Sequence, residues 1–344
     1  MKRKTSLDLI RCIAILMIVT YHFCVIMQQT DSVFCTTPNG SWGIIGTAMF
    51  FMLSGYLLEG KCHREFHIRK FYKSRFLAIF PLFYMNWIVG YAVQVHRYQS
   101  YFWGGEPWKL ILTVLGVDGY MQWFEYDCYY VVGEWFTAVI IGVYLLFPLL
   151  RKGYNCHIRI TTVVLTILFV LQGVRQHIYV PADATLLTGL FLVWIGMLIR
   201  RYHRFFVSSN GFLAAAAAVL LLELTVKMPG QDFRQVYWSV PLAFVIFTVC
   251  LRLFDEINGE SRFGWVAGYF SEISYGLYLC HHFLIYLSTA FLLQYMDQPV
   301  QLFKGYLIDL LLGLLLAAVF TFSWNKMQLF GYRIRMRSIL RKNQ

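Results

Sequence analysis

Charged residues are scarce in this 344-residue sequence: only 14% are Asp, Glu, Lys or Arg, whereas 58% are hydrophobic. This composition, with a mean hydropathy of +0.56, excludes a water-soluble domain, because such a domain would have no place for so much apolar surface. The net charge of +12 is confined to short segments between apolar runs, which argues against a basic nucleic-acid-binding domain. The composition predicts a membrane protein.

Metal-binding and secretion signals are also missing. The eight cysteines form no CxxC pair and no Cys/His spacing suited to zinc or haem, so we expect no metal site and no tightly bound cofactor. Only Cys35 and Cys128 lie in predicted outer loops, where a disulfide between them is one alternative. The first apolar run is too long for a cleavable signal peptide. We expect one membrane domain over residues 1–344, without a soluble accessory domain.

Ten apolar runs approach or reach the roughly 20 residues that a membrane-spanning helix needs. They lie near 7–28, 43–59, 76–95, 129–150, 158–176, 185–200, 211–228, 236–254, 269–291 and 303–324. The segment 108–117 is too short to span and is expected to be re-entrant or interfacial. Most Lys and Arg residues fall on the side that holds both termini, which the positive-inside rule makes the cytoplasm. The predicted class is all-α: a polytopic transmembrane helical bundle of about ten helices with both termini cytoplasmic.

The first run contains ionisable residues at membrane depth. Arg11 and His22 are eleven residues apart, which is three helical turns plus about 20°, so they share one helix face about 16 Å apart along the axis. Asp8 lies near the same stripe. An ionisable group in the bilayer costs about 2.5–3.5 kcal/mol on insertion scales, so such a line normally faces a bundle interior or a wet cavity. The stripe is a candidate functional site.

Two other runs also place ionisable groups at membrane depth. Glu134 is expected about five residues inside the outer end of the fourth run, where a buried carboxylate favours a functional role. His281 and His282 lie near the middle of the ninth run. Adjacent helical positions point about 100° apart, so at most one of these histidines is expected to face His22. The other is expected to hydrogen-bond a neighbouring helix.

A basic segment follows the second run, and Ser54, Gly55 and Tyr56 lie within that run. The small pair favours close helix packing, and Tyr56 can donate a hydrogen bond. The basic segment is either a topogenic or phospholipid contact, or a binding site for an anionic phosphate ligand. Its cations near the start of the third run are Arg69, Lys70, Lys73 and Arg75.

Together these segments resemble the membrane acyltransferase-3 family, integral membrane enzymes that O-acylate sugars of surface polysaccharides and related envelope molecules. The resemblance lies in LDLIRCIAILMIVTYHF, with ten residues between arginine and histidine, in the Ser-Gly-Tyr of FFMLSGYLLEG, and in SYGLYLCHH. Pro81 with Tyr84, and Glu134 with YLLFPLL, recur in the same order, so the resemblance covers nearly the whole chain. One position departs: the family commonly has a second arginine before the proline, where this chain has Ala78.

The resemblance implies transfer of an acyl group, most often acetyl from acetyl-CoA on the cytoplasmic side, to a hydroxyl of a cell-surface or lipid-linked carbohydrate. His22, with an ordinary pKa near 6.5, suits the general base. Glu134 or Asp8 would orient its imidazole, Arg11 would meet the donor side, and His281 is a further catalytic candidate. The expected donor-binding residues are Arg69, Lys70, Lys73, Arg75, Ser54 and Tyr56.

Two other classes stay open on the sequence alone. A proton-coupled secondary transporter would use the same buried groups as a proton relay, but the two halves show no inverted repeat. A non-catalytic membrane scaffold would leave those groups without a purpose. Aromatic residues from Trp103 to Tyr130 suit stacking on sugar faces and equally an interfacial belt. We expect a multi-pass protein of a bacterial cell membrane, in contact with the lipid bilayer, an acyl-CoA donor and a carbohydrate acceptor, and not with nucleic acid.

Overall fold

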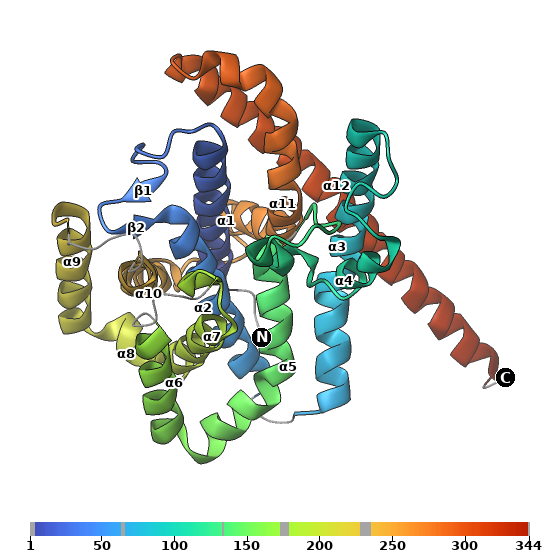
Figure 1. Cartoon of the computed structure of the whole chain (residues 1–344). Helices are drawn as coiled ribbons and strands as arrows, with labels where there is room; N and C mark the ends of the chain where they lie inside the picture. Colours follow the sequence, from blue (N-terminus) through green and yellow to red (C-terminus); the bar gives the residue numbers. More distant parts are fainter. Residues whose placement is uncertain (1–3, 63–65, 133, 173–178, 228–234, 343–344) are drawn as a thin grey trace.

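A computed structural model of the chain describes residues 4–62, 66–132, 134–172, 179–227 and 235–342. Helices dominate these residues, and a two-stranded hairpin joins β1 (Thr36–Thr37) to β2 (Gly40–Ser41). One helix corresponds to each of the ten predicted runs (Figure 1). These helices are α1 (Thr5–Ile26), α2 (Trp42–Cys62), α3 (Ile68–Tyr98), α5 (Glu134–Cys156), α6 (Ile158–Gln172), α7 (Leu186–Arg201), α9 (Asn210–Thr225), α10 (Gln235–Phe254), α11 (Arg262–Leu292) and α12 (Pro299–Lys342).

Seven of the helices in the described part of the chain are long and apolar enough to cross a membrane: α1, α2, α3, α5, α10, α11 and α12. Helices α6, α7 and α9 have 15 or 16 residues, which gives them roughly 24 Å of length against about 30 Å of hydrocarbon. The all-α class and the polytopic helical bundle are confirmed. The cytoplasmic placement of both termini stays a prediction.

Short helices fill the connections. The segment 108–117 forms parts of η1 (Pro107–Lys109) and α4 (Leu110–Val114), followed by η2 (Asp118–Phe124), so it is too short to span, as predicted. The others are η3 (Ala182–Ala184), α8 (His203–Ser208) and η4 (Leu293–Tyr295).

The predicted start of the fourth run was wrong, because α5 begins at Glu134 and not near 129. The backbone carbonyl of Tyr129 accepts a hydrogen bond from the indole of Trp87 at 2.9 Å, and its hydroxyl donates to the carbonyl of Gly105. The segment before α5 is therefore tied to α3 and to the outer loop in an irregular conformation. Glu134 is the first residue of its helix and does not lie inside it.

Helix α2 lies at the centre of the bundle and packs against α1, α7 and α10. Glycines allow the closest of these approaches. A Cβ atom on Gly55 would lie 1.9 Å from the backbone oxygen of Val193, and one on Gly196 would lie 1.9 Å from that of Met52. The backbones of α2 and α7 therefore touch directly, as small residues permit in membrane helices.

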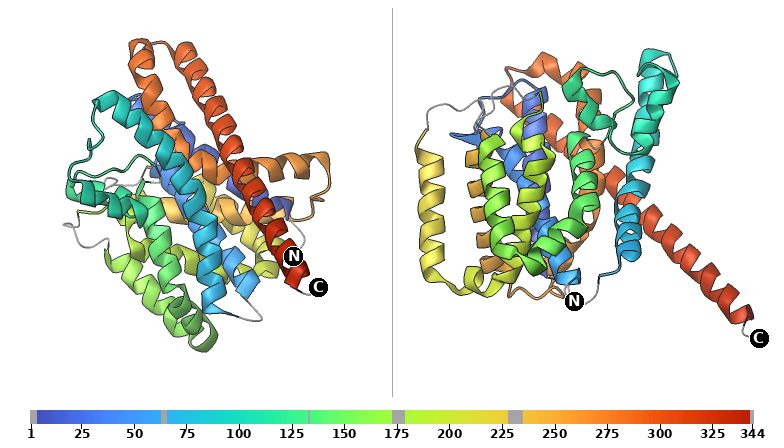
Figure 2. Two further views of the ribbon diagram at one scale, coloured as in Figure 1. Left: turned by 90° about the vertical axis from the view of Figure 1, so that its right-hand side faces the viewer. Right: turned by 60° about the horizontal axis from the view of Figure 1, so that its bottom comes forward.

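The remaining helices surround this centre. Helix α9 lies at one edge, while α3 and α12 lie at the opposite edge (Figures 1 and 2). Helix α12 has 44 residues and continues well beyond the rest of the bundle. Helix α11 connects the centre to this edge, because it packs against α1, α3 and α12.

Candidate functional site

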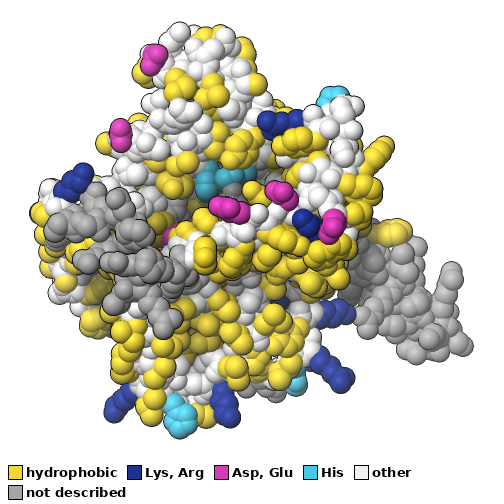
Figure 3. Space-filling model, viewed as in Figure 1, with side chains coloured by type: hydrophobic (Ala, Val, Ile, Leu, Met, Phe, Trp, Pro, Cys, Tyr) yellow, Lys and Arg dark blue, Asp and Glu magenta, His cyan; other side chains and the backbone are white. Residues whose placement is uncertain are grey.

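A cavity of about 1570 Å³ lies at one end of the bundle. The carboxyl ends of α1, α3 and α11 line it together with the amino end of α2 and the segment around 122–131. Figure 3 shows histidine side chains within a hollow of this face and acidic side chains close to it. Glu125, Asp127 and Asp183 are the acidic lining residues. The predicted topology makes this the outer end.

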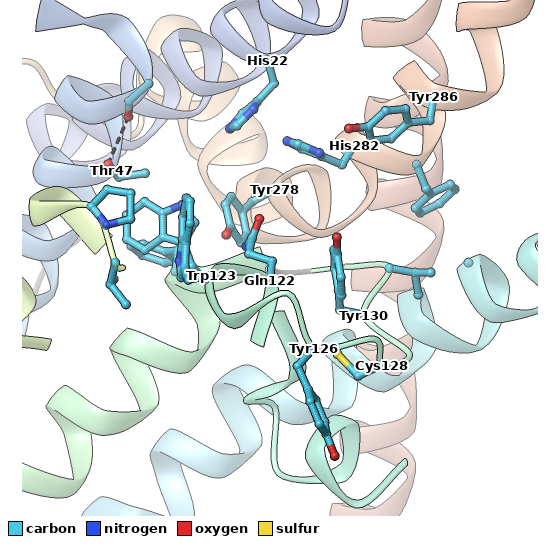
Figure 4. Close-up of a pocket in the computed structure, with 18 of the residues that line it drawn as sticks. His22, Thr47, Gln122, Trp123, Tyr126, Cys128, Tyr130, Tyr278, His282 and Tyr286 are labelled. Atoms are coloured by element: carbon cyan, nitrogen blue, oxygen red, sulfur yellow. Dashed lines mark hydrogen bonds between the residues drawn. The ribbon is translucent and has the colours of Figure 1, made fainter. Parts of the chain in front are cut away.

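Three histidine rings, here called the cavity histidines, meet at the cavity, and two of them line it. The ring centroid of His22 lies 4.1 Å from that of His282 and 5.2 Å from that of His281, and the last two are 4.6 Å apart. His22 and His282 line the cavity and point toward each other in Figure 4. His281 is buried, and its Nδ1 lies 2.7 Å from the carbonyl oxygen of Tyr278. Because a carbonyl only accepts, Nδ1 carries the proton and directs the lone pair to Nε2.

The prediction that at most one of His281 and His282 faces His22 was wrong. Their side chains do diverge, as adjacent helical positions must. His22 comes from a different helix and contacts the ring on each of these two positions. A third ring can therefore meet both of the diverging rings.

Arg11 and His22 both face α11, so the predicted stripe is confirmed as one contact face. Nη1 of Arg11 donates to Oγ of Ser271 at 2.8 Å. The contacts Arg11–Ser271 and His22–His282 advance in the same direction along both chains, so α1 and α11 run parallel. Asp8 is buried one turn nearer the N-terminus. Arg11 and Asp8 are not among the described lining residues of the cavity, so the stripe has a histidine end in the cavity and a charged end away from it.

Glu134 begins α5 beside the cavity, since Trp135 and Phe136 both line it. The side chain of Glu134 lies outside the described residues. Its predicted role in orienting the imidazole of His22 therefore stays a prediction.

The predicted donor cations lie at the opposite end of α3 from the cavity. Arg69, Lys70 and Lys73 are exposed on its first turns. Arg75 is half-buried, with its guanidinium 5.4 Å from the ring centroid of Tyr144. The hydroxyl of Tyr144 shares a hydrogen bond of 2.9 Å with that of Ser54. Arg75 therefore contacts the ring of Tyr144, and Ser54 contacts the hydroxyl of the same tyrosine.

Tyr56 belongs to a separate, largely buried network. Its hydroxyl accepts from Nη1 of Arg200 at 3.1 Å and lies 3.2 Å from Nδ1 of His203. Nε2 of His203 is 3.2 Å from the carboxylate of Asp255, which also pairs with Lys4 at 2.8 Å. The network joins the ends of α2, α7 and α10 to the start of α1. Tyr56 therefore bonds to a different set of side chains from Ser54, and its predicted role in donor binding stays a prediction.

The charges in this network shift each other's protonation. Burial alone would raise the pKa of Asp255, but the ammonium of Lys4 and the imidazole of His203 outweigh it, so the pKa is lowered. Burial and the nearby Lys4 lower the pKa of His203. The ion pair between Lys4 and Asp255 is therefore held in its charged form by the fold.

A family model for an acyltransferase domain of the acyltransferase-3 type matches residues 4–324. The match spans α1 to α12 and includes all three cavity histidines. The chain belongs to the acyltransferase-3 family. Comparisons with curated proteins and with solved structures found no match. Membership establishes acyl transfer as the class of reaction, and an enzyme of that class needs a base beside its acceptor hydroxyl.

Sequence reasoning missed several buried polar residues of this acyltransferase, at the site and away from it. The sequence did not decide which of His281 and His282 faces the site, and His282 is the one that lines the cavity. Arg200, His203 and Asp255 lie at helix ends, where charges resemble topogenic signals. The only sequence signal for their network was a tyrosine hydroxyl, that of Tyr56, within an apolar run.

The alternative of a disulfide in the acyltransferase was also wrong, because Cys35 and Cys128 are both buried free thiols. Sγ of Cys128 donates to the backbone oxygen of Asp118 at 3.4 Å. Cys35 lies in the loop before β1, where its backbone nitrogen donates to the carbonyl of Ser32. The two thiols therefore lie in different loops.

Proposed function

We propose that this acyltransferase moves an acetyl group from acetyl-CoA to a hydroxyl of a cell-surface or lipid-linked carbohydrate, with His22 as the general base. The observation that supports this most is the placement of His22 in the floor of a large, open, aromatic cavity. A base in such a place meets an acceptor that enters from outside. Family membership supplies the reaction class, and the cavity supplies the argument for a sizeable polar acceptor.

The reaction balances with one base. The acceptor oxygen attacks the thioester carbonyl carbon, and its proton passes to the imidazole of His22 as the C–O bond forms. The tetrahedral intermediate then collapses, the C–S bond breaks, and the same proton passes to the leaving thiolate. His281 acts as a positioning residue, because its ring contacts that of His22 and is itself fixed by the carbonyl of Tyr278.

The acceptor side of the cavity suits a carbohydrate. Trp103, Trp123, Tyr126 and Tyr130 line it, and aromatic faces pack well against the apolar faces of sugar rings. Carboxylates at the same surface accept hydrogen bonds from sugar hydroxyls. A volume of about 1570 Å³ exceeds the range of about 300–1,000 Å³ for typical small-molecule sites, so the acceptor is expected to be larger than one sugar unit.

The donor side suits an anionic carrier. Charge-assisted hydrogen bonds from the cations at the start of α3 would hold the phosphates of CoA. The flexible arm of the donor must then extend toward His22, past the level of Phe51, which lies on α2 between Ser54 and the cavity residue Thr47. The ring of Phe51 packs against that of Phe136 at an angle of 48°, with centroids 4.6 Å apart. Both rings are buried, so they would have to move apart for the thioester to pass between them.

The test is transfer of radiolabelled acetyl from acetyl-CoA by purified protein in lipid nanodiscs, with an extract of bacterial envelope carbohydrates as acceptor. His22→Ala is expected to reduce labelling by about 10²–10⁴-fold, the usual effect of losing a general base. The matched control is His157→Ala, because His157 is exposed and follows the end of α5 that lies away from the cavity. Labelling by His22→Ala at the rate of the control would reject His22 as the base, and no CoA release by any form would reject acetyl-CoA as the donor.

A further inference from the structure

The three cavity histidines also have the composition of a metal site. Each offers one ring nitrogen, and these nitrogens all lie within 4.8 Å of one another. Nitrogens that bind a tetrahedral zinc at about 2.0–2.1 Å lie roughly 3.4 Å apart. The three side chains therefore need to close by little more than an ångström to share one ion. Sequence reasoning found no metal motif because His22 lies some 260 residues before the other two ligands.

The surroundings of His281 support a ligand role. Its Nδ1 donates to the carbonyl of Tyr278 at 2.7 Å, which fixes the ring orientation and the neutral tautomer. Metal-binding histidines almost always make such an outer hydrogen bond with the nitrogen that does not bind the metal. The nitrogen opposite, Nε2, is then the one that carries the lone pair.

Access and chemistry fit the same assignment. His22 and His282 line the open cavity, so an ion has a path from outside and water can complete its coordination. Three neutral imidazoles suit zinc, cobalt, nickel or copper, whereas magnesium and calcium prefer oxygen ligands. The cluster therefore selects a transition metal from the outer side.

We propose that His22, His281 and His282 bind one divalent transition-metal ion of the zinc class, and that the bound ion blocks acyl transfer. The block follows because coordination uses the lone pair with which His22 would accept the acceptor's proton. The metal site rests on the geometry of the cluster, and only the block rests on the proposed function. Free zinc on the outer side would then control the enzyme.

The direct test is a titration with Co²⁺ of protein that carries no polyhistidine tag and has been dialysed against chelator. One equivalent is expected to give the visible absorption of a four-coordinate ion, and Zn²⁺ is expected to displace it. His282→Ala is expected to weaken Co²⁺ binding by at least about 100-fold, since loss of an outer hydrogen bond alone costs 10–100-fold. His157→Ala is the control and should bind like the unaltered protein. Equal binding by His282→Ala, or no absorption at one equivalent, would overturn the site.

A measurement on the unaltered protein guards against a variant that fails to fold. X-ray absorption of the Zn²⁺ form is expected to show three imidazole nitrogens at about 2.0–2.1 Å. A shell of sulfur, or of oxygen without imidazole, would overturn the assignment, because the cluster offers nitrogen ligands.

The block is tested by adding Zn²⁺ to the transfer assay. Labelling is expected to fall over the same Zn²⁺ concentrations that fill the site, and chelator should restore it. In His282→Ala the Zn²⁺ concentration that halves acetyl transfer should rise as far as zinc binding weakens. This holds whatever the rate of transfer by the variant without zinc. Zinc binding without inhibition would overturn the block and leave the site standing. An absence of transfer in every form would reject the proposed function, while the Co²⁺ titration would still decide the site.

Discussion

The two ends of the bundle are built differently. The outer end is hollow, with a cavity of about 1570 Å³ that is lined by His22 and His282, and His281 is buried beside them. At the inner end a pocket of only about 210 Å³ lies beside Glu59, Arg151 and Arg201. There the helices are held by backbone contacts at Gly55 and by ion pairs around Asp255.

The residues that react and the residues that stabilise the fold therefore lie at different ends of the bundle. A reacting group needs space for a substrate, and His22 has it, whereas Arg200 and His203 use their nitrogens to bind Tyr56 and Asp255. Substitutions in the inner network should therefore reduce stability and leave the rate of the folded fraction unchanged. Substitutions of outer histidines should do the reverse.

The largest effect on stability is expected from Gly55→Ala. The added Cβ would lie 1.9 Å from the backbone oxygen of Val193, and a backbone atom cannot turn aside as a flexible side chain can. The helices α2 and α7 must separate, so we expect a loss at or above the upper end of the ~1–3 kcal/mol typical of overpacking. Thermal unfolding in detergent measures it. Gly211→Ala is the control, because its Cβ would lie 4.0 Å from Oγ of Ser209, an ordinary van der Waals distance, and an equal loss in both variants would contradict the backbone contact.

The next effect is expected from Asp255→Asn. It removes the charge that pairs with Lys4 at 2.8 Å and with His203 at 3.2 Å. Breaking a fully buried pair costs about 3–5 kcal/mol, and we expect about 2 kcal/mol here because the Lys4 side chain keeps 28% of its exposure. Thermal unfolding and the specific activity of the folded fraction are measured together. Glu256→Gln alters an exposed neighbour and should change neither; a drop in specific activity alone would place Asp255 in the reaction.

The same comparison explains what the sequence could predict. Each helix of the bundle was found because hydropathy is a local property, summed over about 20 residues of one run. The Arg11–His22 stripe was found because both residues lie on one helix, where spacing alone fixes the shared face. The ends of α3, α5 and α12 were placed less well, because tertiary contacts such as that of Trp87 with Tyr129 decide where a helix begins.

What depends on two or more helices was not predictable. The meeting of His22 with both His281 and His282 depends on how α1 and α11 pack. The link from Arg75 through Tyr144 to Ser54 joins three helices, and nothing in the sequence pairs those positions. The different contacts of two predicted donor-binding residues have the same cause, since Tyr56 lies on α2 only two positions from Ser54 yet bonds to Arg200.

A smaller effect is expected from Arg75→Ala, which tests whether the inner end binds the donor. Removing one phosphate contact should raise the KM for acetyl-CoA about tenfold, equivalent to ~1.4 kcal/mol, with kcat nearly unchanged, because only ground-state binding is lost. The half-buried position of Arg75 over Tyr144 makes it the best placed of the predicted donor cations. Steady-state kinetics with donor and acceptor varied separately measures the change. Arg159→Ala, an exposed arginine, is the control, and an unchanged donor KM in Arg75→Ala would leave the basic segment as an anchor only.

The smallest effect is expected from the pH dependence of the segment that leads to the cavity, through Asp118. Asp118 is buried at the start of η2 and accepts hydrogen bonds from Oγ1 of Thr113 at 2.7 Å and from the backbone nitrogen of Gly119 at 2.9 Å. Burial outweighs these bonds and raises the pKa of Asp118 from 3.8 to about 6. The folded state therefore holds a proton that the unfolded state has already lost, so the stability from this group is fully present below pH 3.8 and is lost as pH rises through about 6.

Between pH 5 and pH 7 this loss amounts to about 1 kcal/mol, since a shift of one pKa unit corresponds to 1.36 kcal/mol. Asp118→Asn cannot ionise and should lack that part of the pH dependence, whatever its absolute stability. Limited proteolysis of the segment around 118–132 at both pH values measures the difference, and Asp31→Asn, on an exposed loop, is the control. The same loss between pH 5 and pH 7 in Asp118→Asn would mean that another group titrates, and the hydrogen bonds of Asp118 would then hold its buried carboxylate ionised.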